Sequence, residues 1–542
     1  MSQTTEAPKS GGLVRSVGFW GLMFISLGSI IGSGWLMGAL NAAQVAGPAS
    51  VLSWVLAAAM LSLLALVYAE LGSAYPVAGA AGRFAYYSHG SLAGFFAGWA
   101  AWLQAVFIGP IEVLACIAYV NSTEWAKTNF NMLDRAGMLN GRGLVVAFIS
   151  MIFFTAMNLA GAKFLSESNT WIVIWKTIVP LLAILVVASV QFEPGNFSTG
   201  GGFMPHGFHG VFAALTGGVV FALQGFEQAV QLAGEAKDPK RDLSRAILTA
   251  MAIGAAIYLA LQIVLIGALE PSAVAKDWSN PLGDVSDYGA WYTVALALGF
   301  GWLAKVLLID AVISPVSTGI VYVGTTARLS YALGEETEMP SALTKTNKVG
   351  APWVSILLGS IIGCVALGPF PSWSALVGAV TGATAVMYAI APVALAALQR
   401  SDPNRPRSYR VPMPGFVLPV AFVSANLIIY WGGFKTTVII VASMLLGMAI
   451  FVIGAKMKRT DGMETAPAAL WIVPWMLGHL VIGFLGSYGD WARGILPMWV
   501  DIVVVIVFSL VIYKMAMVER LQPSAVDHQV ERDAHQLSNY EM

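Results

Sequence analysis

Four ionisable side chains, Glu112, Lys176, Glu227 and Asp310, stand inside long apolar segments of this sequence. Lipid offers a charged group no partner, so an ionisable residue within a membrane span is a functional candidate by default. A carboxylate there must be protonated or paired, and an amine is under the same constraint. The chemistry open to these residues is therefore proton transfer, binding of a charged substrate, or mutual pairing.

Each of the four also has a structural interpretation. Lys176 lies six residues, or about 9 Å, beyond the expected start of its span. Its amine either reaches back to the cytoplasmic face or stays buried, where desolvation disfavours its charged form and a proton can replace a bound sodium ion. Glu112 and Asp310 either carry a proton, orient a lysine or bind an amine, or serve as structural partners. Glu227 either caps a half-helix, whose N-terminus favours negative charge, or takes part in gating or proton transfer.

Glycine and polar residues interrupt two of the apolar segments. Gly32–Gly34 lies in the middle of the first segment, and Gln224–Gln228 breaks the pattern of the sixth. Such residues are poor helix formers, and non-helical backbone at membrane depth survives only where it is buried in protein or lines a wet cavity. A close-packed face between continuous helices is the alternative. Gly225 follows Gly32 by 193 residues and the two segments start 191 residues apart, which favours matching breaks in the two halves of a transporter.

The composition indicates an integral membrane protein. Of 542 residues, 57% are hydrophobic and 11% are charged, against about 25% charged residues in soluble domains. Lys plus Arg equals Asp plus Glu, at 29 each, so no nucleic-acid partner is expected. Cys116 and Cys364 lie in apolar runs and form no disulfide framework. The sequence contains no phosphate-binding GxxxxGK loop, which argues against nucleotide hydrolysis.

Apolar runs of about 20 residues recur along the chain, each long enough to cross a hydrocarbon core of about 30 Å. We count fourteen, which predicts an all-α membrane protein. The expected spans are residues 17–43, 48–72, 92–121, 143–161, 170–190, 208–233, 244–269, 289–332, 353–368, 373–398, 415–433, 436–456, 466–487 and 496–516.

The distribution of basic residues predicts the orientation in the cell (inner or plasma) membrane. With a cytoplasmic N-terminus, 21 of the 29 Lys and Arg residues lie in inward segments and six in outward ones, while Lys176 and Lys305 lie within spans. This asymmetry follows the positive-inside rule. Because the number of spans is even, both termini are expected to be cytoplasmic. The polar tail after Lys514 is expected to be disordered.

The matching breaks also predict how the chain is divided. Spans one to five (17–190) and six to ten (208–398) are expected to form two inverted repeats of five helices. Spans eleven to fourteen (415–516) would then be peripheral. Cytoplasmic tails at 1–16 and 517–542 complete this organisation.

Several motifs together resemble the amino acid–polyamine–organocation superfamily. They are Gly32-Ser33-Gly34, Tyr68-Ala69-Glu70-Leu71-Gly72 leading to Pro76, Gly225-Phe226-Glu227, and the run from Ala233 to Asp242. Within the superfamily the chain looks like the bacterial aspartate–proton symporter branch. The residues that carry this narrower resemblance are Tyr87–Gly90, Gly301–Leu303, Asp310-Ala311 with Ser314-Pro315, Pro371–Trp373 and Tyr430-Trp431, together with an additional helix pair at the end.

The resemblance implies roles for matching positions. Backbone N–H groups around Ser33 and Gly34 would hold the α-carboxylate of an amino acid, helped by the half-helix dipole. Carbonyls near Ile30, Phe221 and Gln224 would take its α-amino group. Phe221 would also be an aromatic gate, and Lys176 matches the proton-responsive lysine of proton-coupled members. The residues so assigned are Ile30, Gly32, Ser33, Gly34, Gly109, Phe221, Gln224 and Gly225 for substrate, and Lys176, Glu112, Glu227 and Asp310 for proton coupling or gating.

Two of these positions depart from the family pattern. Gln224 replaces the usual apolar residue of the sixth helix, and Phe221 replaces the tryptophan of some relatives. Both departures fall where the side chain of a substrate would lie.

The leading functional hypothesis is a proton-coupled importer of an acidic amino acid such as aspartate, working by alternating access around the midplane site. No cofactor is expected beyond the coupled H⁺. No metal is expected either, because His206 and His209 have HxxH spacing but no further ligand nearby. A permease or exchanger for cationic or neutral amino acids or polyamines is the close alternative. A membrane-embedded enzyme would need a clustered nucleophile, base or metal set, which the sequence lacks, and paired half-helix breaks fit a carrier better than a channel.

Overall fold

The computed structural model describes residues 17–77, 80–231, 233, 236–283, 288–335, 340–458 and 465–539. Within these ranges the regular structure is helical, and the β contacts are two isolated bridges, Val17 with Ala236 and Leu133 with Leu139. The predicted all-α class is therefore confirmed. The predicted tail at 1–16, the Gly234-Glu235 pair of the motif after helix six and the last residues, 540–542, lie outside the described residues.

Eleven helical runs in the described residues are long and apolar enough to cross a membrane. Three further apolar helices are shorter: Phe19–Ile30, Gly207–Leu223 and Trp353–Ala366. These three fall on predicted spans one, six and nine, and the first two are the spans in which breaks are expected. The total of fourteen spans stays a prediction.

The helices follow one another in three groups. The first half consists of α1 (Phe19–Ile30), α2 (Gly34–Ala46), α3 (Ser50–Ala74), α4 (Ala80–Asn121), α5 (Glu124–Asn129), α6 (Gly141–Leu159) and α7 (Ala162–Val190). The second consists of α8 (Gly207–Ala214), a π-helical turn (Leu215–Val219), α9 (Val220–Leu223), α10 (Gln228–Gln231), α11 (Pro239–Ala268), α12 (Pro271–Val274), α13 (Ala290–Ala297), α14 (Gly301–Glu335), α15 (Trp353–Ala366) and α16 (Trp373–Ser401). The last group is α17 (Pro414–Trp431), α18 (Phe434–Lys458), α19 (Ile472–Leu485), α20 (Met498–Glu519) and α21 (Pro523–Asn539).

Two predicted span boundaries are wrong. The predicted start of the fifth span, residue 170, agrees with the apolar stretch Trp171–Val190, although α7 itself begins earlier, at Ala162. The third is predicted from residue 92, whereas α4 begins at Ala80 and changes direction at Gly90, which has φ +82°. The eighth is predicted as one span over 289–332, whereas Gly299, with φ +79°, separates α13 from α14.

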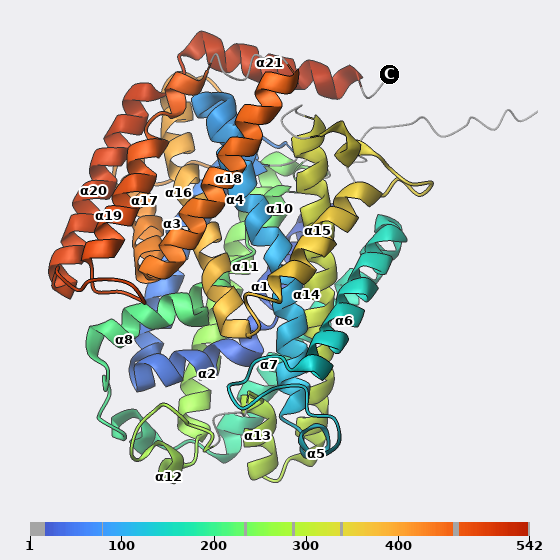
Figure 1. The fold of residues 1–542 in the computed structure, drawn as a ribbon, viewed down its shortest axis with the longest axis vertical. Coiled ribbons are helices and arrows are strands. Elements are labelled where there is room, and N and C mark those ends of the chain that lie inside the picture. Colours follow the sequence, from blue (N-terminus) through green and yellow to red (C-terminus); the bar gives the residue numbers. More distant parts are fainter. Residues whose placement is uncertain are drawn as a thin grey trace, which may run out of the picture.

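α4 occupies the centre of the bundle. It packs against α14 and against α16, while α11 packs against both α3 and α1. Figure 1 shows α17, α19 and α20 along one flank and α6 and α15 along the opposite one. α5, α12 and α13 lie at one end of the molecule and α21 at the other. Following the predicted topology, we call these the outer end and the inner end.

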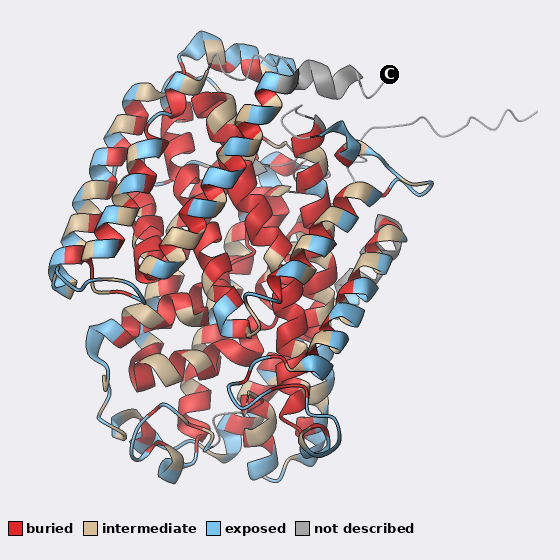
Figure 2. Cartoon of the chain, viewed as in Figure 1, coloured by how far each residue is buried: buried red, intermediate tan, exposed pale blue. Residues whose placement is uncertain are grey.

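The flanks of the bundle carry the apolar surface that lipid requires. Figure 2 shows a buried interior surrounded by helices whose outward faces are exposed. Among the exposed large apolar side chains are Val145, Ile149 and Ile152 of α6, and Leu477 and Val481 of α19. Soluble monomers rarely expose large contiguous apolar patches, so these faces are suited to contact with lipid.

The tail that is expected to be disordered is helical where the structure describes it. α20 continues to Glu519, and α21 follows from Pro523 to Asn539. The backbone N–H of Leu521 donates to Ser88 O (2.9 Å), and Ser401 Oγ donates to Leu521 O (2.7 Å). Val526 is fully buried. A few apolar residues spaced among polar ones are therefore enough to dock this segment on the inner ends of α4 and α16.

Candidate functional site

The two interrupted helices meet at their breaks. α1 ends at Ile30 and α2 begins at Gly34, while α9 is separated from α10 by non-helical backbone after Gln224. Gly225 has φ +108°, and a Cβ added there would lie 2.8 Å from the carbonyl carbon of Ser29. Only glycine combines this backbone conformation with so close an approach. Both interruptions expected from the sequence are confirmed, and they touch one another.

Glu112 of α4 binds the first break. Its Oε2 accepts the backbone N–H of Ser33 (2.9 Å), and its Oε1 accepts the Ser33 hydroxyl (3.1 Å). Gly32 leaves room for the carboxylate, because a Cβ there would lie 2.8 Å from Oε1. The N-terminal end of α2 carries partial positive charge, which favours a carboxylate at this point. The N–H group expected to hold a substrate carboxylate is thus bound to Glu112 in this structure.

Lys176 of α7 holds the same break from another side. Its Nζ donates to the carbonyl of Gly28 (2.7 Å) and to Thr318 Oγ1 of α14 (2.6 Å), and the side chain is 2% exposed. α7 begins at Ala162, so Lys176 lies about 21 Å along this helix, and about 9 Å beyond the predicted start of the span. Because the amine is buried and bonded to α1 and α14, it does not reach back to the predicted cytoplasmic face.

Glu227 closes the second break. Its Oε2 accepts the backbone N–H of Gly225 (3.0 Å) and the hydroxyl of Tyr388 (2.7 Å), and its Oε1 accepts Gln104 Nε2 (3.0 Å). Both oxygens of this buried carboxylate are thereby satisfied. This geometry is that of a cap on non-helical backbone, and a role in gating or proton transfer stays a prediction.

A small cavity lies between the two breaks. Among its lining residues are six that the sequence singles out, Ile30, Gly32, Gly34, Glu112, Phe221 and Gln224, together with Thr318 and Tyr322. The carbonyl of Ile30, expected to accept a substrate amine, already accepts the hydroxyl of Tyr258 (2.8 Å). The backbone N–H of Gly32 also donates to this oxygen (3.1 Å), so both of its lone pairs are taken in the structure.

The model of the amino acid permease family matches residues 17–451 of the chain. The chain belongs to that family. The glutamate/serine transporter AimA of Bacillus subtilis (strain 168) is 35% identical over 510 residues, which are 93% of this chain and 94% of that protein. The aspartate-proton symporter of the same organism is 33% identical over 534 residues, 96% and 99% of the two chains. The branched-chain amino acid permease BcaP is more distant, at 27% identity over 82% and 94%.

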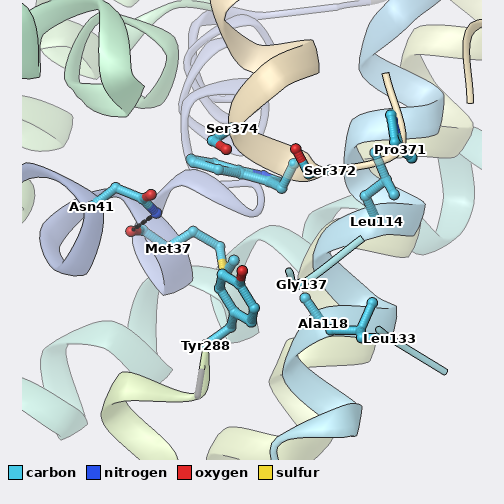
Figure 3. A pocket seen from close by; sticks show the side chains of 11 residues that line it. Met37, Asn41, Leu114, Ala118, Leu133, Gly137, Tyr288, Pro371, Ser372 and Ser374 are labelled. Atoms are coloured by element: carbon cyan, nitrogen blue, oxygen red, sulfur yellow. Dashed lines mark hydrogen bonds between the residues drawn. The ribbon is translucent and has the colours of Figure 1, made fainter. Parts of the chain in front are cut away.

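The permease has a second small cavity toward its outer end. Figure 3 shows Tyr288 and Leu133, both from segments predicted to lie outside, among the residues around it. Trp373 at the start of α16 also lines this cavity, donates its indole N–H to Ser33 Oγ (3.1 Å) and packs edge to face against Phe221 with ring centroids 5.6 Å apart. Because Phe221 lines the cavity between the breaks, the rings of Trp373 and Phe221 stand between the second cavity and the breaks.

Two residues that the sequence assigns to the site contribute to helix packing in the permease. Gly109 faces Val323 of α14, whose Cγ2 would lie 3.3 Å from an added Cβ. Asp310 is buried and accepts Trp35 Nε1 (3.0 Å) and Ser314 Oγ (2.8 Å), which links α14 to α2. Neither residue lines either of these two cavities.

Three residues around the candidate site, Thr318, Tyr322 and Trp373, are not assigned to it by sequence reasoning, although Trp373 belongs to the Pro371–Trp373 motif. A threonine or tyrosine within an apolar helix carries no charge or spacing signal that marks a binding role. Trp373 has one weak signal, because Ser372 before it is a good N-cap residue. Ser372 Oγ accepts the N–H of Ala375 (3.4 Å), which places Trp373 in the first turn of α16.

Proposed function

We propose that this permease imports an acidic amino acid together with a proton, by alternating access around the two breaks. The similarity to the glutamate/serine transporter and to the aspartate-proton symporter, over nearly the whole chain, supports the substrate class. The observation that carries the coupling is the pair of ionisable groups on the first break. Glu112 binds the Ser33 N–H, and Lys176 binds the Gly28 carbonyl.

Glu112 can make substrate binding depend on a proton. While charged, it holds the N–H of Ser33 and repels the α-carboxylate of an arriving amino acid. Protonation removes that charge, so the half-helix N-terminus becomes available to the substrate. Loss of the proton on the cytoplasmic side restores the contact with Ser33 and displaces the substrate carboxylate. Proton and substrate are thereby taken up and released together.

Lys176 can couple the same proton cycle to the movement of α1. Its ammonium bridges a carbonyl of α1 and a hydroxyl of α14, two oxygen ligands of the kind that would otherwise hold a metal cation. Deprotonation of the amine weakens this bridge. A change in charge that strengthens the contact in one orientation and not in the other shifts the population between them.

Lys176→Ala tests the coupling in proteoliposomes with an imposed proton gradient. We expect acid-stimulated uptake of labelled aspartate to be abolished, while some exchange of internal for external substrate remains. Lys305→Ala is the matched control, because Lys305 is an exposed lysine within α14. Acid stimulation at the wild-type level in Lys176→Ala would remove the coupling role.

A permease or exchanger for neutral amino acids is the second candidate, because the name of AimA includes serine beside glutamate. Competition against labelled aspartate by glutamate, serine, leucine, lysine and putrescine separates the candidates. The acidic proposal expects glutamate to compete best. Competition by leucine, lysine or putrescine in preference to glutamate would contradict it.

A further inference from the structure

Gln224 has an amide nitrogen without a partner. The residue lines the cavity between the breaks, is 2% exposed, and its Nε2 forms no hydrogen bond with any described residue. Buried polar groups in proteins are nearly always hydrogen-bonded. An orphaned donor on the wall of a binding cavity is therefore a group available to a ligand.

Thr384 of α16 determines which end of this amide is available. Its Oγ1 donates to Gln224 Oε1 (2.9 Å), so the carbonyl end is held against α16. The remaining end is an NH₂ group, which has two N–H donors and no acceptor. Gln224 therefore presents only donors to the cavity.

Tyr322 of α14 adds a second polar group to the same wall. It is buried and lines the cavity, and its hydroxyl forms no hydrogen bond with a described residue, although Gln228 lies near it. A tyrosine hydroxyl can donate as well as accept. It can thus support Gln224 in binding an oxygen of the ligand.

We propose that Gln224, oriented by Thr384 and assisted by Tyr322, recognises the side chain of the transported amino acid. The proposal deepens the transport function above, because it concerns the cavity assigned there to the substrate. A wall of donors selects side chains with an acceptor oxygen, which are carboxylates, hydroxyls and amides. It disfavours an ammonium, which has no lone pair to offer, and apolar side chains, which leave the amide unpaired.

Gln262 of α11 provides a matched control. Its Oε1 accepts Trp54 Nε1 (2.7 Å), its Nε2 also has no partner among the described residues, and the residue is buried. Unlike Gln224, it does not line the cavity. The two glutamines thus share chemistry and burial and differ in access to the substrate.

The test measures the affinities of the full-length permease for L-aspartate, L-serine, L-leucine and L-lysine by ligand-induced thermal stabilisation. Gln224→Leu removes the donors at similar size. We expect it to lower the preference for aspartate and serine over leucine by about tenfold or more, the range of one buried hydrogen bond to a charged or polar group. Thr384→Val, which releases the amide, should lower the same ratio less. Gln262→Leu should leave it at the wild-type value.

Gln224→Glu keeps the size of the side chain and replaces donors by acceptors, so it covers the case in which Gln224→Leu does not fold. It should lose aspartate and gain lysine. Wild-type selectivity in either folded Gln224 variant overturns the proposal. Acidic, proton-coupled transport would be overturned by a wild-type permease that prefers serine to aspartate and shows no acid stimulation. In that case the ratio of the affinities for serine and leucine in Gln224→Leu still decides the role of Gln224.

Discussion

At the first break, two carboxylates compete for one backbone N–H donor. Glu112 accepts the N–H of Ser33 at 2.9 Å, and the α-carboxylate of a substrate is expected to need the same donor. If the Glu112 carboxylate must lose its charge before the substrate α-carboxylate can bind, then the binding of a proton favours the binding of substrate. Such coupling is reciprocal, so affinity for the substrate should rise as pH falls.

Glu112→Gln tests this coupling, because it keeps the shape of the side chain and removes the charge. We expect a substrate affinity that no longer changes with pH, and a loss of accumulation driven by a proton gradient. Ligand-induced thermal stabilisation at acidic and neutral pH measures the first, and uptake into proteoliposomes the second. Glu270→Gln, at an exposed position, should behave as wild type. Affinity that still rises on acidification in Glu112→Gln would exclude Glu112 as the proton site.

The charged members of the site can be predicted from the sequence, but their partners cannot. Glu112 and Lys176 stand out because charge is rare in apolar runs. Thr318 and Tyr322 do not, because neutral polar residues in membrane helices become ligands only through the helix that faces them. The Ser33–Glu112 contact joins residues 79 positions apart, whereas spacing rules within one helix reach only three or four residues.

Among the helical elements, the crossing of the two breaks depends on one glycine. Gly225→Ala would place a Cβ 2.8–3.0 Å from three atoms of Ser29 at φ +108°. Strained backbone of this kind costs about 1–3 kcal/mol, so we expect a loss of stability of at least that order and a loss of substrate binding. Thermal unfolding in detergent with and without substrate measures both.

Gly378→Ala is the control for this prediction and should have the opposite sign. Gly378 lies in α16, where an added Cβ meets no atom of the described residues within 4 Å. Alanine is the better helix former, and such changes stabilise proteins by about 0.4–1 kcal/mol. Equal behaviour of the two alanine variants would show that the contact between the breaks does not require Gly225.

The breaks can be predicted from sequence, whereas several helix ends cannot. Gly32–Gly34 and Gln224–Gln228 can be recognised because they are poor helix formers within apolar segments. Residues 162–170 are rich in polar and charged types. Hydropathy therefore starts the fifth span at residue 170, although the backbone of α7 is helical from Ala162. Apolarity reports contact with lipid, while helix length is set by backbone hydrogen bonds, and the two need not coincide.

Across the whole molecule, two ion pairs at opposite ends differ sharply in environment. At the inner end, Glu70 of α3 pairs with Arg407, between α16 and α17, with 3.2 Å between Oε1 and Nε, and it also accepts Gln399 Nε2 (2.8 Å). The side chains of Arg407 and Glu70 are 3% and 0% exposed. At the outer end, Lys435 and Asp490 pair at 3.6 Å with 49% and 75% exposed. The first pair ties the predicted core to the peripheral helices.

Removing one member of a buried ion pair strands the other charge, at a cost of about 3–5 kcal/mol. We expect Glu70→Ala and Arg407→Ala each to lower the free energy of unfolding by about this amount. The double variant should lose less than the two single losses combined, because neither charge is then left alone. Lys435→Ala, in the exposed pair, should cost at most about 1 kcal/mol. Denaturation in a single detergent compares the free energies of unfolding of all four variants. Equal losses for Arg407→Ala and Lys435→Ala would show that the buried pair does not hold α3 to the segment after α16.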